Sequence, residues 1–362
     1  MTPRRVLMTV DAVGGVWRYA VDLCRALNGA GVEVLLACLG PHPNAGQRAE
    51  LAALRRTHLQ VVDAPLDWMA EDAAALAALP RRLEDLAAGC DLLHLNLPSQ
   101  AAGMGGRRPV VVVSHSCVVT WWAAMRAQPL PEDWAWQKSL NARGLARADA
   151  VVAPSQSHAV ALRKVYGLAR PVHVVPTAGE PVAVTSGPRG HFVLAAGRWW
   201  DEGKGPALLD AAAARVAVPV QAAGECTGIN GQGFAFRHVQ ALGPLPHSAL
   251  RARMRRCAIF ASPSQYEPFG LAALEAGQGG APLLLADIPT YREIWDGAAQ
   301  FARDAMGFAA AIKALMEDSP RRAALGARAR ERSERYTSEP QLSALLAAYA
   351  SSAAASSSSL VD

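Results

Sequence analysis

The sequence predicts an α/β fold in which two doubly wound parallel sheets follow one another along the chain. At 362 residues, the chain is too long for one ordinary core and fits two domains. Short apolar runs alternate with helix-like segments, which is the pattern of repeated β-then-α units in an open parallel sheet. The alternation lapses once, at residues 177–190, into the Pro, Gly, Thr and Ser composition of a connector.

The first β/α series begins with a strand at Val6–Val10 and a helix from about Val16 to Ala30, where Gly29 and Gly31 end it. Each later apolar run is short enough for a buried parallel strand. The expected strands of this domain are Val32–Leu39, Leu92–Leu97, Val110–Val113 and Ala150–Ala153. We place the first domain at residues 1–180.

The second series follows the connector, and we place its domain at residues 191–336. A helix is expected near Gly205–Arg215. The expected strands are Phe192–Ala196, Val218–Ala223, Ala258–Ser262 and Pro282–Ala286. A last helix at 337–350 is expected to pack back toward the first domain. Residues 351–362 are rich in Ser and Ala with little to bury, so we expect a disordered tail.

Composition excludes several classes of protein. A hydrophobic fraction of 51% against 19% charged residues indicates a globular chain. There is no apolar run of membrane-spanning length and no cleavable leader pattern, and the six cysteines form no C-x-x-C pair. We therefore expect a cytoplasmic protein without a metal site. The net charge of +5 comes without basic runs interleaved with aromatic residues, so nucleic acid is not an expected partner.

The most informative segment is residues 262–277, in which Glu267-Pro-Phe-Gly270 follows an apolar strand and precedes a helix containing Glu275. A strand–turn–helix in such a sheet places the turn at the carboxyl ends of the strands, where ligands bind. Backbone N–H groups at the helix N-terminus suit phosphate oxygens there. The alternative is that both glutamates are solvated surface charges.

Two other loops favour the ligand-binding alternative. Arg198 and Lys204 lie in a loop that follows the strand Phe192–Ala196, and a guanidinium with an ammonium suits a diphosphate. In the first domain, Gly14 and Gly15 follow the first strand, and glycines allow close approach of the backbone to a ligand.

Together these segments resemble the retaining glycosyltransferases of family four, also described as glycosyl transferases group 1. The matching pieces are Gly14-Gly15, the loop from Arg198 to Lys204-Gly205, and Glu267-Pro-Phe-Gly-Leu with Glu275 eight residues later. The resemblance implies the GT-B architecture of two Rossmann-like domains facing across a cleft. Here the chain departs from the family in its glycine-rich segment 277–282 and in having Thr177-Ala-Gly where Asn-Gly is frequent.

The resemblance also implies roles. Glu267 would bind hydroxyls of the donor sugar, Glu275 the ribose, and Arg198 with Lys204 the diphosphate. The backbone from Phe269 through Gly270 to Leu271 would contact sugar and phosphate, and Gly14 with Gly15 would complete the donor-binding set. His115, just after the strand Val110–Val113, stands where the family often has a His near the reacting carbon, so it joins Glu267, Arg198 and Lys204 as a candidate catalytic residue. The alternative for His115 is a structural histidine.

The acceptor side is marked by four tryptophans. Trp121, Trp122, Trp134 and Trp136 follow His115 closely. Trp rings stack on sugars and also favour membrane interfaces. We assign Trp121 and Trp122 to acceptor binding on a loop, with a lid packed on the core as the alternative. A carbohydrate, lipid-linked or small-molecule acceptor and peripheral contact with the inner face of a membrane stay open.

The predicted reaction is transfer of a hexose from UDP- or GDP-hexose, with retention and without cofactor or metal, because the chain has no Asp-x-Asp pair. Two alternatives remain: a non-catalytic protein that binds nucleotide sugars, and a sugar phosphorylase or hydrolase on the same fold. A nicotinamide oxidoreductase is disfavoured, since Gly14-Gly15 lacks the Gly-x-Gly-x-x-Gly spacing.

Overall fold

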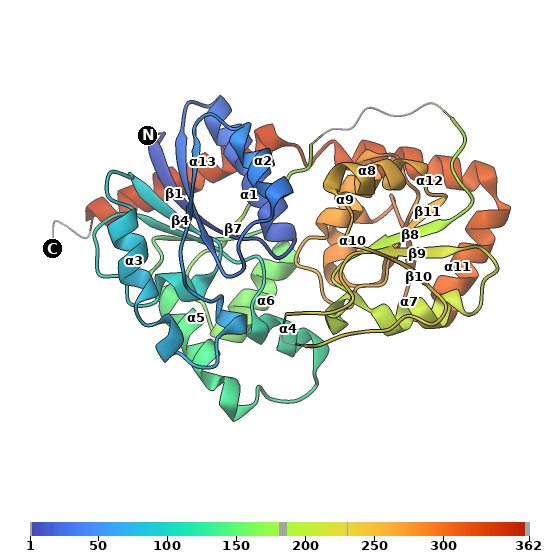
Figure 1. The fold of residues 1–362 in the computed structure, drawn as a ribbon, viewed down its shortest axis with the longest axis horizontal. Helices are drawn as coiled ribbons and strands as arrows, with labels where there is room; N and C mark the ends of the chain where they lie inside the picture. The colour runs from blue at the N-terminus through green and yellow to red at the C-terminus, as the bar shows by residue number, and fades with distance from the viewer. Residues whose placement is uncertain (1, 181–186, 230, 359–362) are drawn as a thin grey trace. The chain divides into compact units, whose positions relative to one another are not determined.

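The computed structural model describes residues 2–180, 187–229 and 231–358. The chain divides into two compact units: unit 1, Met1–Ala178 with Ser338–Asp362, and unit 2, Gly179–Thr337. The division falls inside the expected connector 177–190, of which residues 181–186 lie outside the described part. Each unit has its own parallel sheet and helices (Figure 1), so the predicted α/β fold class is confirmed.

The sheet of unit 1 has the strand order β3-β2-β1-β4-β5-β6-β7, and all its pairs are parallel. Its strands are β1 (Arg5–Asp11), β2 (Glu33–Leu39), β3 (Thr57–Val61), β4 (Leu92–Leu95), β5 (Val110–Val113), β6 (Ala150–Ala153) and β7 (His173–Val174). The order reverses at β1, which pairs with β2 on one side and β4 on the other. Ligands of doubly wound sheets bind at the carboxyl ends of the strands at this reversal.

Helices cover both faces of this sheet. They are α1 (Gly15–Gly29), α2 (Ala45–Ala52), α3 (Leu79–Leu86), α4 (Val118–Met125), α5 (Ala135–Arg147), α6 (Gln156–Tyr166) and α13 (Ser338–Ser358). Successive residues of β1 point to opposite faces of the sheet. Met8 packs in one core cluster with residues of α1 and α13. Leu7 packs in the other with residues of α3 and α5. The sheet is therefore buried on both sides.

Unit 2 repeats the arrangement, with the order β10-β9-β8-β11-β12-β13 and the reversal at β8. Its strands are β8 (Val193–Ala196), β9 (Val220–Ala223), β10 (Gln240–Gly243), β11 (Ile259–Ser262), β12 (Leu283–Ala286) and β13 (Gln300–Ala302). Its helices are α7 (Pro206–Ala213), α8 (His247–Arg256), α9 (Leu271–Gln278), α10 (Pro289–Trp295), α11 (Ala305–Glu317) and α12 (Ser319–Ser333). The loops that follow β8 and β11 thus leave neighbouring strands at the reversal.

Short 3-10 turns complete the elements. They are η1 (Asp67–Met69), η2 (Ala74–Leu76), η3 (Pro98–Ala101), η4 (Glu132–Trp134) and η5 (Glu202–Lys204).

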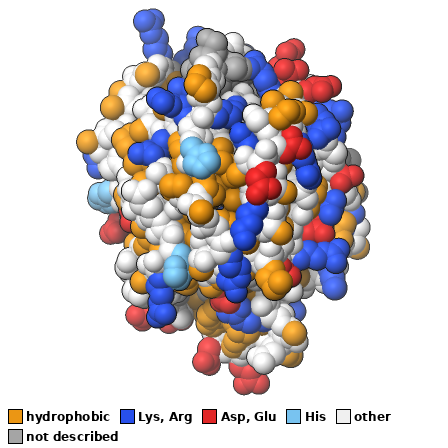
Figure 2. All heavy atoms as spheres, turned by 90° about the vertical axis from the view of Figure 1, so that its right-hand side faces the viewer, with side chains coloured by type: hydrophobic (Ala, Val, Ile, Leu, Met, Phe, Trp, Pro, Cys, Tyr) orange, Lys and Arg blue, Asp and Glu red, His pale blue; other side chains and the backbone are white. Residues whose placement is uncertain are grey.

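Charged side chains of both signs are interspersed over the face of the molecule drawn in Figure 2.

The last helix differs from the prediction. Helix α13 continues to Ser358, whereas a disordered tail was expected from residue 351; residues 359–362 lie outside the described part. The Ala residues of this stretch have the highest helix propensity, and Ser352 is fully buried with its hydroxyl on the carbonyl of Tyr349. Leu345 and Tyr349 are buried in the same core cluster as residues of α1, so α13 belongs to the core of unit 1 (Figure 1).

Candidate functional site

The two loops at the reversal of the unit 2 sheet are tied together by backbone hydrogen bonds. The N–H groups of Gln265 and Tyr266 donate to the carbonyl of Gly203, over 2.8 and 3.2 Å. One loop follows β8 and carries Arg198 and Lys204; the other follows β11 and carries Glu267. The predicted charged residues of the two loops are thereby held at one sheet edge.

Lys204 and Glu267 form an ion pair across these loops, between Nζ and Oε1. The hydroxyl of Ser264 donates to the same carboxylate oxygen over 3.3 Å. The two side chains of the ion pair are only 18% and 13% exposed, so both charges are largely withdrawn from water. A ligand that carries both negative charge and hydroxyl groups can replace this ion pair. Its anionic group can bind Lys204, and its hydroxyl groups can donate to Glu267.

Two glycines make the approach of the loops possible. Gly205 has φ of +68°, and a Cβ there would lie 2.3 Å from the carbonyl oxygen of Pro263. Gly270 has φ of +93°, and a Cβ there would lie 2.5 Å from Tyr291. Only glycine fits both positions without displacement. Helices α7 and α9 begin directly after these glycines. Helix α9 has backbone N–H groups from its first residue, Leu271, whereas the first residue of α7, Pro206, has none.

Arg198 has a different environment from Lys204. Its guanidinium pairs with Asp201 over 3.3 Å and lies 5.2 Å from the ring centroid of Trp200. Its side chain is 39% exposed. The structure therefore brings Lys204 and Glu267 into contact and holds Arg198 against Asp201 in the same loop.

Glu275 lies in the second turn of α9 and is paired with His247, the first residue of α8. Nε2 of His247 lies 2.6 Å from Oε1 of Glu275, whose side chain is only 9% exposed. The side chain of Phe269 is buried and packs edge to face on Tyr336, with ring centroids 5.6 Å apart. At position 269, therefore, the backbone is the part that a ligand could contact. Leu271, the first residue of α9, is half-buried.

In unit 1, the loop after β1 leads directly into α1. Gly14 has φ of +133° as the residue before the helix, and Gly15 is its first residue. A Cβ on Gly15 would meet no atom within 4 Å, so the backbone there is open to a ligand. The N–H of Val13 donates to Asp11 Oδ1 over 2.9 Å, which fixes the turn.

His115 follows β5 and contacts the end of β4. Its Nε2 lies 2.9 Å from Oδ1 of Asn96, and its ring meets Tyr19 edge to face at 4.3 Å. Burial, with smaller contributions from His94 and His158, lowers the pKa of His115 to about 3. His115 is therefore neutral at pH 7 in this structure.

The tryptophans predicted on a loop lie mainly on helices. Trp121 and Trp122 are in α4, whose N-terminus is capped by Cys117 and Thr120. Arg126 stacks on both rings, at 5.1 and 5.6 Å from their centroids. Both tryptophans are half-buried, so the cluster is partly open to solvent.

Two family models match this chain. The model described as Glycosyltransferase Family 4 matches residues 13–178, and the model described as Glycosyl transferases group 1 matches residues 234–332. The chain belongs to the GT-B glycosyltransferase family. The family predicted from the glutamate and glycine motifs is thus confirmed.

Some curated relatives match this GT-B chain along most of its length, and another matches only part of it. A glycogen synthase of Mycobacterium tuberculosis is 37% identical over 108 residues, which span 29% of this chain and only 25% of that relative. A D-inositol 3-phosphate glycosyltransferase of Xylanimonas cellulosilytica is 28% identical over 94% of this chain and 92% of its own length. A phosphatidyl-myo-inositol mannosyltransferase of Mycolicibacterium smegmatis is 25% identical over 90% and 87%.

Solved structures show the same fold. Sucrose-phosphate synthase from Thermosynechococcus elongatus superposes with a TM-score of 0.76 at 19% identity, covering 94% of this chain and 97% of that one. HepE from Anabaena in complex with UDP-glucose gives a TM-score of 0.74 at 18% identity, covering 95% and 98%. At these identities the likeness establishes the architecture alone.

Several residues of this GT-B chain that contact the predicted site were not foreseen. They are His247 against Glu275, Ser264 against Glu267, and Asn96 against His115. Position after a strand was the signal that could have found Asn96 and Ser264, since β4 ends at Leu95 rather than Leu97 and β11 ends at Ser262. His247 opens a helix distant in sequence from Glu275, and no local pattern marks it.

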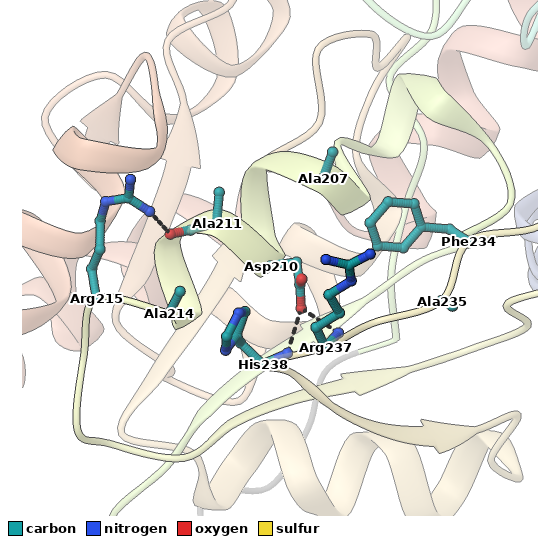
Figure 3. A pocket seen from close by; sticks show the side chains of 9 residues that line it. All are labelled: Ala207, Asp210, Ala211, Ala214, Arg215, Phe234, Ala235, Arg237 and His238. Carbon is teal, nitrogen blue, oxygen red and sulfur yellow. Dashed lines mark hydrogen bonds between the residues drawn. The ribbon is translucent and has the colours of Figure 1, made fainter.

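A separate hollow lies between α7 and the segment 234–238 (Figure 3). It has a volume of about 500 Å³ and is lined by Ala207, Asp210, Ala211, Ala214, Arg215, Phe234, Ala235, Arg237 and His238. Oδ1 of Asp210 accepts the N–H groups of Arg237, His238 and Val239, as the dashed lines in Figure 3 show for two of them. This carboxylate thus holds the adjoining loop, and the hollow contains none of the predicted site residues.

Within the described part of the chain, no group of three or more His, Cys, Asp or Glu side chains is placed to hold a metal ion. Among the helices of the described residues, none combines the length and the apolar character needed to cross a membrane.

Proposed function

We propose that this chain is a retaining hexosyltransferase that uses a UDP- or GDP-hexose donor and needs no metal or other cofactor. The observation that carries the proposal is the Lys204–Glu267 ion pair at the strand reversal of unit 2. It pairs a cation suited to phosphate with a carboxylate suited to sugar hydroxyls.

The donor diphosphate is assigned to Lys204, Arg198 and the first turns of α7 and α9. Lys204 and Glu267 neutralise each other without ligand. A bound diphosphate gives Lys204 a second anionic partner, and the first-turn N–H groups of α9 after Gly270 add donors for the phosphate oxygens. Arg198 keeps Asp201 as a neighbour and reaches the ligand from the same loop.

The sugar and the ribose are assigned to different glutamates. Glu267 accepts hydrogen bonds from the hexose hydroxyls, and the Ser264 hydroxyl, which donates to its Oε1, holds the carboxylate in place. Glu275 receives the ribose diol, with Oε1 already oriented by His247 and the rest of the carboxylate available to the ligand. The backbone at Phe269 to Leu271 contacts the phosphate and the sugar between them.

Catalysis is assigned to charge stabilisation of the leaving diphosphate. Lys204, Arg198 and helix N-termini offset the charge that develops as the glycosidic bond to phosphate breaks, which is the role that a metal has in other transferases. The absence of Asp-x-Asp from the sequence favours this metal-free arrangement. Retention is proposed from the family resemblance, with the acceptor attacking on the same face that the phosphate leaves.

The acceptor is assigned to unit 1, near His115 and the Trp121–Trp122 cluster, with the donor also touching Gly14 and Gly15. Two relatives over most of the chain are named for inositol phosphate and phosphatidyl-myo-inositol chemistry. A polyhydroxylated acceptor, free or lipid-linked, fits both names. A lipid-linked acceptor would bring a cytoplasmic enzyme into peripheral contact with the inner face of a membrane.

Release of nucleoside diphosphate from UDP- and GDP-hexoses, measured with and without a panel of polyol and glycan acceptors and with EDTA, tests the proposal. Acceptor-dependent release that survives EDTA supports a metal-independent transferase. Acceptor-independent release indicates a hydrolase, phosphate-dependent release a phosphorylase, and binding without release under any condition a non-catalytic protein. Lys204→Ala should abolish release, whereas Lys313→Ala, at an exposed lysine of α11, should not.

A further inference from the structure

A buried polar network surrounds His115 at the carboxyl ends of β1, β4 and β5 in unit 1. Oδ1 of Asn96 lies 2.9 Å from Nε2 of His115 and 3.2 Å from Nε2 of His94. Nδ1 of His94 lies 2.8 Å from the hydroxyl of Tyr349 on α13. Asn96, His94 and Tyr349 are each at most 2% exposed, so water cannot substitute for these partners.

The orientation of the Asn96 amide is determined by Thr9. Nδ2 of Asn96 lies 2.6 Å from the backbone carbonyl oxygen of Thr9, and that oxygen can only accept. The amide nitrogen must therefore face Thr9, and the amide oxygen must face the two imidazole rings. The N–H of Asn96 also donates to the Thr9 hydroxyl over 2.8 Å, which holds the residue at a second point.

The proton positions on both rings follow. Because Asn96 Oδ1 can only accept, His94 and His115 must each carry a proton on Nε2. Nδ1 of His94 then accepts the Tyr349 hydroxyl proton. Burial lowers the pKa of His94 to about 4 and that of His115 to about 3, so both rings are neutral at pH 7. A neutral His115 with its proton on Nε2 has a lone pair on Nδ1.

We propose that Asn96 is the positioning residue of His115: it fixes the ring and its Nε2–H tautomer, so that Nδ1 is offered to a ligand as a hydrogen-bond acceptor. This inference rests on the proposed function only for the identity of that ligand, a hydroxyl of the donor or acceptor. The edge-to-face contact of His115 with Tyr19 holds the other side of the ring. His115 thus accepts from a hydroxyl and does not act as an acid through Nδ1.

Two-bond ¹H–¹⁵N spectra of the full chain labelled at histidine test the tautomer directly, with His115 assigned by comparison with His115→Gln. The wild-type spectrum should show a neutral His115 protonated at Nε2, with an Hε2 resonance protected from solvent exchange. Asn96→Ala should remove that protected resonance. Asn96→Asp should restore it in the protonated form that burial favours, because one carboxyl oxygen then accepts from the imidazole while the O–H replaces the donation to the Thr9 carbonyl. Ser114→Ala is the matched control, since Ser114 contacts His158 and not His115 over hydrogen-bond distance.

An Nδ1–H tautomer of wild-type His115, or an Hε2 resonance unchanged in Asn96→Ala, overturns the proposal. If Asn96→Ala does not fold, the wild-type and Asn96→Asp spectra still test the proposal, because an Nδ1–H tautomer of wild-type His115 would overturn it. In transfer assays Asn96→Ala should lower kcat about tenfold, the effect of losing one hydrogen bond in the transition state, with partial recovery in Asn96→Asp. The spectra need no substrate, so a chain without turnover would refute the proposed function and leave the tautomer assignment standing.

Discussion

Nε2 of His247 lies 2.6 Å from Oε1 of Glu275 and joins the start of α8 to the second turn of α9. A carboxylate only accepts, so His247 carries the proton of this hydrogen bond. Glu275 is therefore held in one orientation before any ligand arrives. The pairing occupies one of the two carboxylate oxygens of Glu275.

His247→Ala should weaken nucleoside diphosphate binding by about 0.5 to 1.5 kcal/mol, because Glu275 must then be ordered by the ligand itself. Isothermal titration with UDP and GDP measures the change. His238→Ala, at an exposed histidine that lines the separate hollow, is the control and should bind as the wild type does. Tighter binding by His247→Ala would mean that His247 competes with the ribose for Glu275.

The two glutamates should respond differently to amide substitution. Glu275→Gln should weaken nucleoside diphosphate binding, since an amide replaces only part of the charge-assisted bonding to the ribose. Glu267→Gln should lower turnover while leaving that binding nearly unchanged, because the diphosphate has no hexose. Titration and turnover assays separate the effects. Equal losses of nucleotide affinity in both folded variants would refute the assignment.

Gly270→Ala should destabilise unit 2 by about 2 to 4 kcal/mol and abolish transfer. It adds a Cβ 2.5 Å from Tyr291 at φ of +93°, so a steric clash joins the backbone cost. Gly297→Ala separates the two contributions: φ there is +77°, and a Cβ would meet nothing within 4 Å. We expect about 1 kcal/mol for that variant. Urea unfolding compares them, and equal losses would remove Tyr291 from the explanation.

The sequence predicted the parts of the fold and site that depend on local pattern. Each apolar run became a strand, and Glu267 and Lys204 were placed at one sheet edge because each follows such a run. Strand β3 was missed because its exposed residues, such as His58 and Gln60, dilute the apolar signal. Edge strand β10 was missed because its sequence, Gln-Ala-Leu-Gly, contains only one large apolar residue, Leu242.

Contacts between distant segments could not be predicted. Asn96 was placed inside a strand, and its contacts with Thr9 and His115 depend on the sheet order that puts β4 beside β1. Tyr349 reaches His94 across 255 residues, and no periodicity encodes that pairing. The tryptophans were expected on a loop because their polar neighbours suggested one, whereas capping by Cys117 and Thr120 starts helix α4 there.

Stability should fall as the pH drops from about 6.5 to about 4. Burial lowers the pKa of His94 and His158 from 6.5 to about 4 and that of His115 to about 3, so the unfolded chain binds more protons than the folded chain in this window. Their contribution is complete above pH 6.5 and is lost as the pH falls toward 4. Asp67 opposes this, because burial raises its pKa. Asp287, with a pKa of about 2, contributes a loss only below pH 3.8.

Urea unfolding at intervals between pH 7 and 4.5 measures this slope. His158→Gln should flatten it, because the substituted side chain does not titrate and the contribution of Asp67 is unchanged. His191→Gln, at an exposed histidine, should leave it as in the wild type. A wild-type stability that is level over this range, or a His158→Gln slope equal to that of the wild type, would contradict the assignment.

Helix α13 is part of unit 1. Leu345, Ala348 and Tyr349 are at most 1% exposed in the cluster that covers one face of the first sheet. A chain ending at Thr337 uncovers that face, so it should be insoluble or lose cooperative unfolding. A chain ending at Ala354 keeps all three residues and the buried Ser352, so its stability should stay within about 0.5 kcal/mol of the full chain.

Two substitutions at Tyr349 separate packing from hydrogen bonding within this helix. Tyr349→Phe keeps the ring and leaves Nδ1 of His94 without its donor, so we expect a loss of about 1 to 3 kcal/mol. Tyr349→Ala also opens a cavity in the core, which raises the expected loss to about 3 to 5 kcal/mol. Calorimetry of the full chain ranks them. A Phe variant as unstable as the Ala variant would assign the whole effect to the hydroxyl, whereas a Phe variant equal to the wild type would mean that Tyr349 only fills space.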